Sequence, residues 1–577
     1  MTTPPVAAAG AASVDRRTLA WGLAGAVVTY LAHPPVGWSL LAWVGPAAWI
    51  MLCTLPRLPG RRPYLDLWLA GVAYWGLTIA WLRLPHPANW GALAFVASYL
   101  GLYLPTFVAL TRVAVHRVRA PLWLAAPVVW TGLELARAHL LTGFLMGSLA
   151  QTQYRRPAVL PLAGIGGEYA VTFLMVAAAS LIAAASRARS IARAQSRRRA
   201  ELTMEWLAGA VVVGGLFAIG AAYDAVISGV ARKTTTVRIA LVQSDLLADW
   251  KGEEGRDAEV MRQQTALSLA AAHKARAADK PLDLIVWPET MFRQWLTAID
   301  ADNPPPREIV DRAERQQTIA DLSKLARTVD ANLLVGIDRV QLSGAASPGA
   351  AVDDDPQDDS PAYGYTMHNS SVGVTRAGAI VGTYDKMHLL PFGEYVPLVD
   401  WIPGLAWITP ITGGATPGAG PTAIALPALA DPERIVRYAP NICYETALPH
   451  LVRRQLHELA ERGDSPDVLV NLTNDAWYWG SAELDMHLAA GVLRAVETRT
   501  PLVIAANRGL SAHIDDAGRI VAVTERDRAD VLVADVPIFA SGARAPTVYV
   551  RTGDWLSGAC LVCCIVLAVV AGWRQRT

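Results

Sequence analysis

The fold of this chain is indicated by the stretch IVRYAPNICYETALPHLVRRQLHELAER, which occupies residues 435–462. Its β-branched and aromatic beginning, 435–438, predicts a strand, and the amphipathic spacing of 446–462 predicts a helix. Cys443 lies between the two. A side chain at such a junction is displayed at the edge of a sheet, near a helix N-terminus whose dipole favours a thiolate.

The sequence on either side repeats this alternation of strands and helices. Short β-branched and apolar runs predict further strands at 237–243, 282–287, 333–337, 370–374, 380–384, 468–471, 502–505 and 531–536. Amphipathic spacing predicts further helices at 256–278, 307–329 and 483–499. Alternation of this kind is typical of a layered α/β domain, which we assign to residues 235–540.

One segment of this domain differs in composition. Residues 341–364 carry five aspartates among proline, glycine, alanine and serine. Such a composition buries too little apolar surface to order itself, so we expect a flexible surface insertion.

Outside this domain the chain consists of apolar runs. Eight of them have the length that a helix needs to cross a bilayer, at 18–34, 37–55, 65–84, 89–111, 120–138, 168–186, 205–223 and 554–573. The first follows two arginines as a signal peptide does, but no small-residue cleavage site precedes more hydrophilic sequence, so we expect a retained span. The sequence therefore predicts a membrane domain at 1–230 with seven spans, and an eighth span near the C-terminus.

The distribution of arginine predicts the orientation of these spans. Arginines gather before span one and after spans two, four, six and eight, which are all loops on one side. Arg155 and Arg156, after span five, are exceptions on the other side. Because positively charged loops stay in the cytoplasm, we expect both termini there and residues 224–553 on the extracytoplasmic side.

The composition limits the classes of function. The chain of 577 residues is 53% hydrophobic with a mean hydropathy of +0.28, which is high for a soluble protein. A net charge of +1 indicates neither an acidic nor a basic partner, and no nucleic acid is expected. The sequence does not determine the oligomeric state, for which we expect a monomer. Only Cys443 of five cysteines lies outside the apolar runs, which argues against disulfides and structural zinc in the domain. The sequence indicates no metal and no cofactor.

Three side chains at predicted strand ends form a chemically sufficient set. Glu289, Lys386 and Cys443 each follow a predicted strand, and strand ends are where α/β domains display functional residues. Taken singly, each has an ordinary explanation: a glutamate at a helix N-terminus, a solvated loop lysine and a packed cysteine. Together they supply a base for the thiol proton, a thiolate that attacks a carbonyl, and an ammonium for the oxyanion.

These three segments resemble the Glu-Lys-Cys triad of the nitrilase superfamily, carbon–nitrogen hydrolases and acyltransferases with a four-layer α-β-β-α sandwich. The stretch KMHLLPFGEYVP at 386–397 is more specific. It is similar to the bacterial apolipoprotein N-acyltransferases, which join such a domain to eight membrane spans. The resemblance covers nearly the whole chain in architecture and 237–515 in motifs. It implies an extracytoplasmic (periplasmic) sandwich attached to a bacterial inner membrane.

The resemblance also implies roles for further residues. Glu394 becomes a second glutamate beside the triad, and Tyr444 and Glu445 support the nucleophile. Trp250 matches a tryptophan near the lipid site of the family, although by itself it is equally a surface or core aromatic. Asn474 lies in another segment that fits the family pattern. The sequence departs from that pattern at Ile504, Ala506 and Arg508, which concern substrate contact rather than the triad.

Aromatic side chains crowd the proline- and glycine-broken segment 389–410, which is too short to span a membrane. The candidates for substrate contact among them are Phe392, Tyr395, Trp401 and Trp407. Two interpretations stay open: a buried loop, or an interfacial lid that dips into lipid, since amphipathic aromatics favour that boundary.

Two ionisable residues lie inside the predicted fifth span. Glu134 and Arg137 are about one helical turn apart, so we expect them to pair, which lowers the cost of placing charge in a membrane. Whether they contact substrate stays open.

The resemblance implies ping-pong acyl transfer. A membrane phospholipid donates a fatty acyl group to Cys443, and the α-amine of a diacylglyceryl-cysteine apolipoprotein accepts it from the thioester. A membrane-tethered amidase that uses the same triad is one alternative. A transporter with a catalytically inactive binding domain is another, which the sparse ionisable residues in the spans disfavour.

Overall fold

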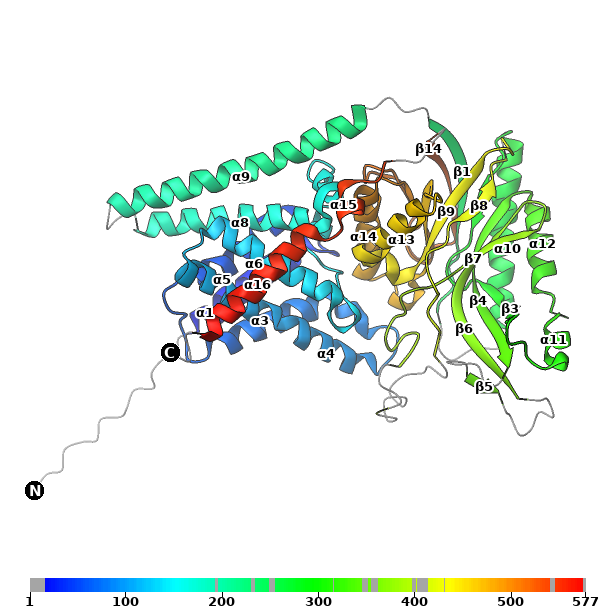
Figure 1. Cartoon of the computed structure of the whole chain (residues 1–577), viewed down its shortest axis with the longest axis horizontal. Coiled ribbons are helices and arrows are strands. Elements are labelled where there is room, and N and C mark those ends of the chain that lie inside the picture. Colours follow the sequence, from blue (N-terminus) through cyan, green and yellow to red (C-terminus); the bar gives the residue numbers. More distant parts are fainter. Residues whose placement is uncertain are drawn as a thin grey trace, which may run out of the picture.

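The structure is a computed structural model in which a helical part and an α/β domain lie side by side (Figure 1). It describes residues 16–191, 196–229, 234–248, 255–314, 316–344, 351–353, 362–396, 401, 414–429, 431–539 and 545–573. Trp250 and Trp407, two of the predicted substrate-contact residues, lie outside the described residues.

The helical part is built from apolar helices separated by prolines, glycines and arginines. These are α1 (Arg17–Ala32), α2 (Gly45–Thr54), α3 (Pro63–Thr78), α4 (Asn89–Gly101), α5 (Tyr103–Val113), α6 (Leu122–His139), α7 (Ala163–Gly166), α8 (Glu168–Ile191), α9 (Ser196–Gly229), α15 (Val548–Thr552) and α16 (Trp555–Trp573). The last of these lies against the helices of the first half of the chain, as Figure 1 shows.

Four segments among the described residues are long and apolar enough to cross a membrane: Asn89–Val118, Glu168–Ser186, Thr203–Ser228 and Trp555–Gly572. They coincide with four of the eight predicted spans. At the other four positions the helices are short or interrupted: α1 and α3 have 16 residues and α2 has 10. Helix α6 carries two charged residues and an internal proline. By this measure the count of eight spans is not confirmed.

The α/β domain contains two sheets. The larger has the strand order β14-β1-β2-β4-β6-β5, with β3 also on β4 and β7 also on β6, and the smaller has the order β13-β12-β11-β10-β9-β8. The strands are β1 (Thr234–Gln243), β2 (Leu284–Val286), β3 (Phe292–Ile299), β4 (Asn332–Gly344), β5 (Ala351–Asp353), β6 (Tyr363–Val374), β7 (Ile380–Asp385), β8 (Ile424–Pro427), β9 (Ile435–Ile442), β10 (Val468–Asn474), β11 (Leu502–Asn507), β12 (Ala512–Ile514), β13 (Ile520–Val523) and β14 (Asp530–Phe539). Strands β9, β10 and β11 run parallel, so their carboxyl ends share one edge.

Apolar side chains divide the domain into four layers. Alternate residues of β1, β9, β10 and β14 form a core between the two sheets. Helices α10 (Arg256–Ala277) and α12 (Thr318–Val329) cover the outer face of the larger sheet. Helices α13 (Pro449–Glu461) and α14 (Ala482–Thr498) cover the smaller sheet, and their other side shares one hydrophobic core with the membrane helices. The predicted α-β-β-α sandwich is therefore present.

Some predicted boundaries are wrong. The helix predicted at 307–329 is divided into α11 (Arg307–Glu314) and α12. Parts of the predicted flexible insertion 341–364 belong to β4, β5 and β6, because pairing along a sheet edge supplies the order that composition alone does not. Strands β3, β5, β8, β12 and β13 were not predicted. Except for β3, these strands have only three or four residues, too few for a clear alternating pattern.

Candidate active site

Cys443 occupies a tight turn at the carboxyl end of β9. The helix predicted from 446 begins only at Pro449, and Cys443–Ala447 forms a 3₁₀ turn before it. The backbone of Cys443 has φ +52°, a left-handed conformation that costs a non-glycine residue roughly 1–3 kcal/mol. Its carbonyl oxygen accepts hydrogen bonds from Asn471 Nδ2 and His487 Nε2, both at 3.2 Å. The surrounding structure therefore fixes the cysteine in a strained position.

Glu289 follows β2 of the larger sheet and is buried. Its segment crosses β4 at Gly336, where a Cβ atom would collide with the backbone of Pro288 and Glu289. The Oε1 atom accepts hydrogen bonds from Asn369 Nδ2 at 2.7 Å and from Lys386 Nζ at 3.4 Å. The Oε2 atom accepts from the backbone N–H of Asn474 at 3.1 Å.

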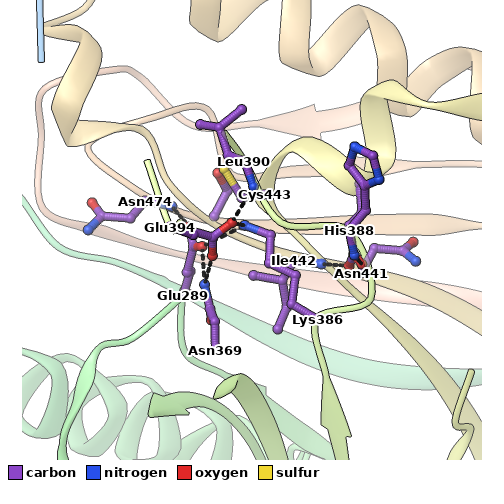
Figure 2. Close-up of polar contacts among 12 residues, drawn as sticks. Glu289, Asn369, Lys386, His388, Leu390, Glu394, Asn441, Ile442, Cys443 and Asn474 are labelled. Atoms are coloured by element: carbon purple, nitrogen blue, oxygen red, sulfur yellow. Dashed lines mark hydrogen bonds and ion pairs between the residues drawn. The ribbon is translucent and has the colours of Figure 1, made fainter. Parts of the chain in front are cut away.

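Lys386 follows β7 and is buried between two carboxylates (Figure 2). Its Nζ atom lies 2.8 Å from Glu394 Oε2 and 3.4 Å from Glu289 Oε1. Burial lowers the pKa of Lys386, but Glu394 and Glu289 outweigh it and raise the pKa above its usual value. Burial likewise raises the pKa of Glu394, but Lys386 and hydrogen bonds from Leu390 and Asn369 reverse the shift and lower it. The lysine therefore stays an ammonium.

Asn369, on β6, is a site residue that the sequence analysis missed. Its Nδ2 atom donates to Glu289 Oε1 at 2.7 Å and to Glu394 Oε1 at 2.8 Å, so one amide joins the two glutamates. An asparagine inside a strand gives no sequence signal. Only the pairing of β6 with β4 and β7 brings it to this edge.

Glu445 links the segment that follows β7 and carries Lys386 to the 3₁₀ turn that carries Cys443. It is buried, and its Oε1 atom accepts from the backbone N–H groups of Met387 and His388 at 2.7 and 3.0 Å. Its Oε2 atom accepts from Tyr384 Oη and from the backbone N–H of Ile442, both at 2.8 Å. These four hydrogen bonds hold the segments that carry Lys386 and Cys443 together.

Tyr444 connects the cysteine turn to the helical part. Its hydroxyl donates to the carbonyl of Gly143 at 3.0 Å, and its ring stacks with Phe144 at 6.4 Å between centroids. Cys443 itself packs against the core that the α/β domain shares with the membrane helices. The thiol therefore lies at the junction of the two parts of the molecule.

The protonation of Cys443 differs from the sequence-based expectation. Burial, followed by Glu289, raises the thiol pKa well above its usual value, and Lys386 only partly opposes this shift. The expected helix N-terminus does not adjoin Cys443, because the 3₁₀ turn intervenes. The resting group is a thiol that needs a base, not a preformed thiolate.

The predicted substrate-contact residues have mixed positions. Asn474 lies beside Glu289, but its backbone makes the contact, while its side-chain Oδ1 accepts from Asn507 at 2.8 Å. Phe392 and Trp401 are 43% and 86% exposed, which contradicts the interpretation as a buried loop at these two positions, and Tyr395 is half-buried.

Two further sets of residues that the sequence analysis singled out form ion pairs or pack in the core. Glu134 and Arg137 pair at 3.5 Å, as expected, and Arg137 also donates to the carbonyl of Met146. At the departures from the family pattern, Ile504 and Ala506 are buried core residues of β11, and Arg508 pairs with Asp245 and Asp527 at 3.2 and 2.8 Å.

One cluster among the described residues has side chains of metal-ligand type: Asp475, Glu483 and His487, whose ligand atoms lie within 4.8 Å of one another. His487 Nδ1 faces Asp475 Oδ1 at 3.3 Å, and its Nε2 faces the carbonyl oxygen of Cys443. Both ring nitrogens of His487 therefore face oxygen atoms of the protein.

Most of the chain is similar to known proteins. The family model for carbon-nitrogen hydrolase matches residues 227–543, more than half of the chain, and the apolipoprotein N-acyltransferase N-terminal domain matches residues 25–181. The fold and site thus define a carbon–nitrogen hydrolase-type protein fused to a membrane domain. The crystal structure of Saccharomyces cerevisiae Nit3, a member of branch 10 of the nitrilase superfamily, matches with a TM-score of 0.33 at 16% identity, over 52% of this chain and 90% of that chain.

Full-length relatives make the assignment more specific. An apolipoprotein N-acyltransferase of Caulobacter vibrioides is 30% identical over 91% of this chain and 89% of its own length. That of Rhodopirellula baltica is 29% identical over 93% of this chain and 95% of its own length. The chain belongs to the apolipoprotein N-acyltransferase family and is an acyltransferase.

Proposed function

We propose that this protein transfers a fatty acyl group from a membrane phospholipid to the N-terminal α-amine of diacylglyceryl-cysteine apolipoproteins, through a thioester on Cys443. The observation that carries the proposal is the position of Cys443. It lies in one site with a base and an ammonium, which contact each other, and it packs against a core shared with the membrane helices.

In the first half-reaction, Glu289 takes the proton of the Cys443 thiol, and the sulfur attacks the glycerol ester carbonyl. Lys386 stabilises the oxyanion of the tetrahedral intermediate. When the intermediate collapses, the ester C–O bond breaks, and the proton on Glu289 passes to the departing lysophospholipid oxygen. A C–S thioester remains.

In the second half-reaction, the α-amine attacks the thioester and gives its proton to Glu289. The C–N bond forms, the C–S bond breaks, and the sulfur recovers the proton. Glu394, Asn369 and Glu445 do not react. They hold Lys386, Glu289 and the segments that carry Lys386 and Cys443 in their relative positions.

Transfer must outcompete hydrolysis, so water must be kept from the thioester. We assign this role to the apolar surroundings of Cys443 and to a lid formed by Phe392, Tyr395 and Trp401. The exposed aromatic side chains at Phe392 and Trp401 suit insertion into the membrane interface.

The arrangement across the membrane is part of the proposal. We count eight spans, which include the four positions where the helices are short or interrupted. An even number of spans puts both termini in the cytoplasm, with the α/β domain on the periplasmic side of the inner membrane. The arginine-rich loops on one side support this orientation.

Mass spectrometry of the intact protein tests the proposal. After incubation with phospholipid, a fatty-acyl adduct that hydroxylamine removes is expected on the wild type and absent from Glu289→Gln and Lys386→Ala. A membrane-tethered amidase with the same triad is the rival. It would leave no acyl label on Cys443 from phospholipid while hydrolysing small amides, and that pattern would contradict the proposal.

A further inference from the structure

Next to Cys443 lies a second polar cluster that the proposed reaction does not use. It consists of Asp475 in the 3₁₀ turn Asp475–Tyr478, and of Glu483 and His487, which lie one turn apart on α14. All three side chains are buried. The cluster is joined to the site by a hydrogen bond of His487 Nε2 to the carbonyl oxygen of Cys443.

We propose that His487 is a positioning residue that, as an imidazolium paired with Asp475, holds the nucleophile turn in its left-handed conformation. The inference rests on Cys443 being the nucleophile of the proposed function. It assigns the three members of the cluster different charges: positive for His487, negative for Asp475 and neutral for Glu483.

The hydrogen bonds of the ring carry this assignment. His487 Nδ1 lies 3.3 Å from Asp475 Oδ1, and Nε2 lies 3.2 Å from the Cys443 carbonyl oxygen. A neutral imidazole has one N–H and satisfies only one acceptor, whereas an imidazolium has two and satisfies both. Loss of the second proton would therefore release either the aspartate or the nucleophile turn.

The two carboxyl groups beside the ring are not equivalent. Asp475 Oδ1 also accepts from the Thr473 hydroxyl at 2.6 Å, so its negative charge is well solvated by protein groups. Glu483 Oε1 lies 4.0 Å from His487 Nδ1, and its Oε2 has no hydrogen-bond partner among the described residues. A buried carboxylate with an unpaired oxygen is costly, so the neutral acid is favoured.

The pKa shifts of His487 and of the acids that face its ring agree with this distribution of charge. Burial, followed by Asp475, raises the pKa of Glu483 well above its usual value. Burial lowers the pKa of His487, but Asp475, through its charge and its hydrogen bond, is the leading influence that outweighs burial and raises the pKa to about 9. Asp485, the other acid on this part of α14, is engaged by Arg526 at 2.9 Å. The imidazolium is thus present below about pH 9 and lost above it.

Holding the turn matters because Cys443 has φ +52°, which it would leave without restraint. Asn471 Nδ2 also donates to the Cys443 carbonyl, but it is shared with the Thr446 hydroxyl at 2.8 Å. His487 is therefore the charged member of the pair of donors and contributes the stronger hydrogen bond.

The experiment uses the full-length protein in detergent and two readouts. The first is alkylation of Cys443 by iodoacetamide at pH 7.5, followed at the peptide level. The second is the rate of acyl-adduct formation with phospholipid between pH 6 and 10. Three variants are compared: His487→Gln, which retains an N–H donor without the charge, Asp475→Asn, and Glu483→Gln as the matched control.

We expect His487→Gln and Asp475→Asn to slow alkylation by about tenfold, the equivalent of one pKa unit. Glu483→Gln, an isostere of a neutral acid, should alkylate at the wild-type rate. Wild-type adduct formation should decline above about pH 9. That decline should persist in Glu483→Gln and disappear in His487→Gln, a change that a purely structural role would not produce.

Two results would overturn the inference: unchanged alkylation in His487→Gln and Asp475→Asn, or a loss in Glu483→Gln as large as in Asp475→Asn. If the wild type forms no adduct at any pH, the proposed function fails, while the alkylation comparison still decides the role of His487. Thermal unfolding of each variant identifies misfolding. If His487→Gln is misfolded, the wild type alone decides: a rate of acyl-adduct formation that does not fall up to pH 10 contradicts the inference.

Discussion

Two buried clusters of this molecule have the same composition, one cation between two glutamates, and different surroundings. In the active site, Lys386 lies between Glu289 and Glu394. At the junction with the membrane helices, Arg494 lies 2.7 Å from Glu168, the first residue of α8, and 2.8 Å from Glu497. Both cations are buried.

The clusters differ in how many neutral donors reach the carboxylates. In the active site, Asn369 donates to both glutamates, and backbone N–H groups of Leu390 and Asn474 donate to one each. At the junction, the backbone N–H of Glu168 donates to Glu497 at 2.7 Å, and Glu168 Oε1 has no partner among the described residues.

The protonation states follow from this difference. The pKa of Glu394 is lowered, whereas burial raises the pKa of Glu497 to about 8 despite the opposing charge of Arg494. Glu497 therefore holds a proton at neutral pH. In the active site, hydrogen bonds from neutral donors add to the charge of Lys386, which is the largest influence that lowers the pKa of Glu394.

The largest effect should come from the thiol, which only the active-site cluster adjoins. We expect Cys443→Ser to lower acyl-enzyme formation by about 10⁴-fold or more, because a serine hydroxyl is far harder to deprotonate. Intact-mass spectrometry measures the adduct. Cys563→Ser, which alters an exposed cysteine of α16, is the control and should keep it. An adduct of equal yield on Cys443→Ser would place the chemistry elsewhere.

Next in size is the removal of the junction cation. Arg494→Met leaves two buried acids without a partner and should lower the free energy of unfolding by roughly 3–5 kcal/mol. Adding Glu168→Gln and Glu497→Gln to it should recover much of this loss, since no charge then remains to be compensated. Thermal unfolding in detergent measures both. Equal stability of the single and the triple variant would contradict the comparison.

The proton on Glu497 gives a smaller effect, which is a dependence of stability on pH. The pKa of Glu497 is higher in the folded chain, about 8, than in an unfolded one, about 4.3. Its contribution to stability is therefore fully present below the unfolded pKa and is lost as the pH rises to about 8. The melting temperature of Glu497→Gln should depend less on pH over that interval than that of the wild type. Identical pH curves would show that Glu497 holds no proton.

The smallest effect concerns the neutral link between the two parts. Tyr444→Phe removes one hydrogen bond, to the carbonyl of Gly143, and keeps the ring contact with Phe144. The cost in free energy of unfolding should be about 0.5–1.5 kcal/mol, well below that of Arg494→Met. A loss as large as that of Arg494→Met would mean that the ion cluster is not the main junction.

The sequence by itself determined the layered α/β domain, most of its strands and helices, and Glu289, Lys386 and Cys443 as candidates. These features are local: alternation along a strand, periodicity along a helix and a reactive side chain at a strand end are all readable within a few residues. The likeness to a known family added Glu394, which contacts Lys386, and Glu445, which accepts a hydrogen bond from the backbone of Met387.

Only the tertiary structure decided how these groups act on one another. Asn369 and His487 gave no local signal, because their importance comes from atoms far away in the chain that pack against them. The resting state of Cys443 was predicted wrongly for the same reason. A pKa depends on burial and on neighbouring charges, and both are set by long-range packing rather than by the residues adjacent in sequence.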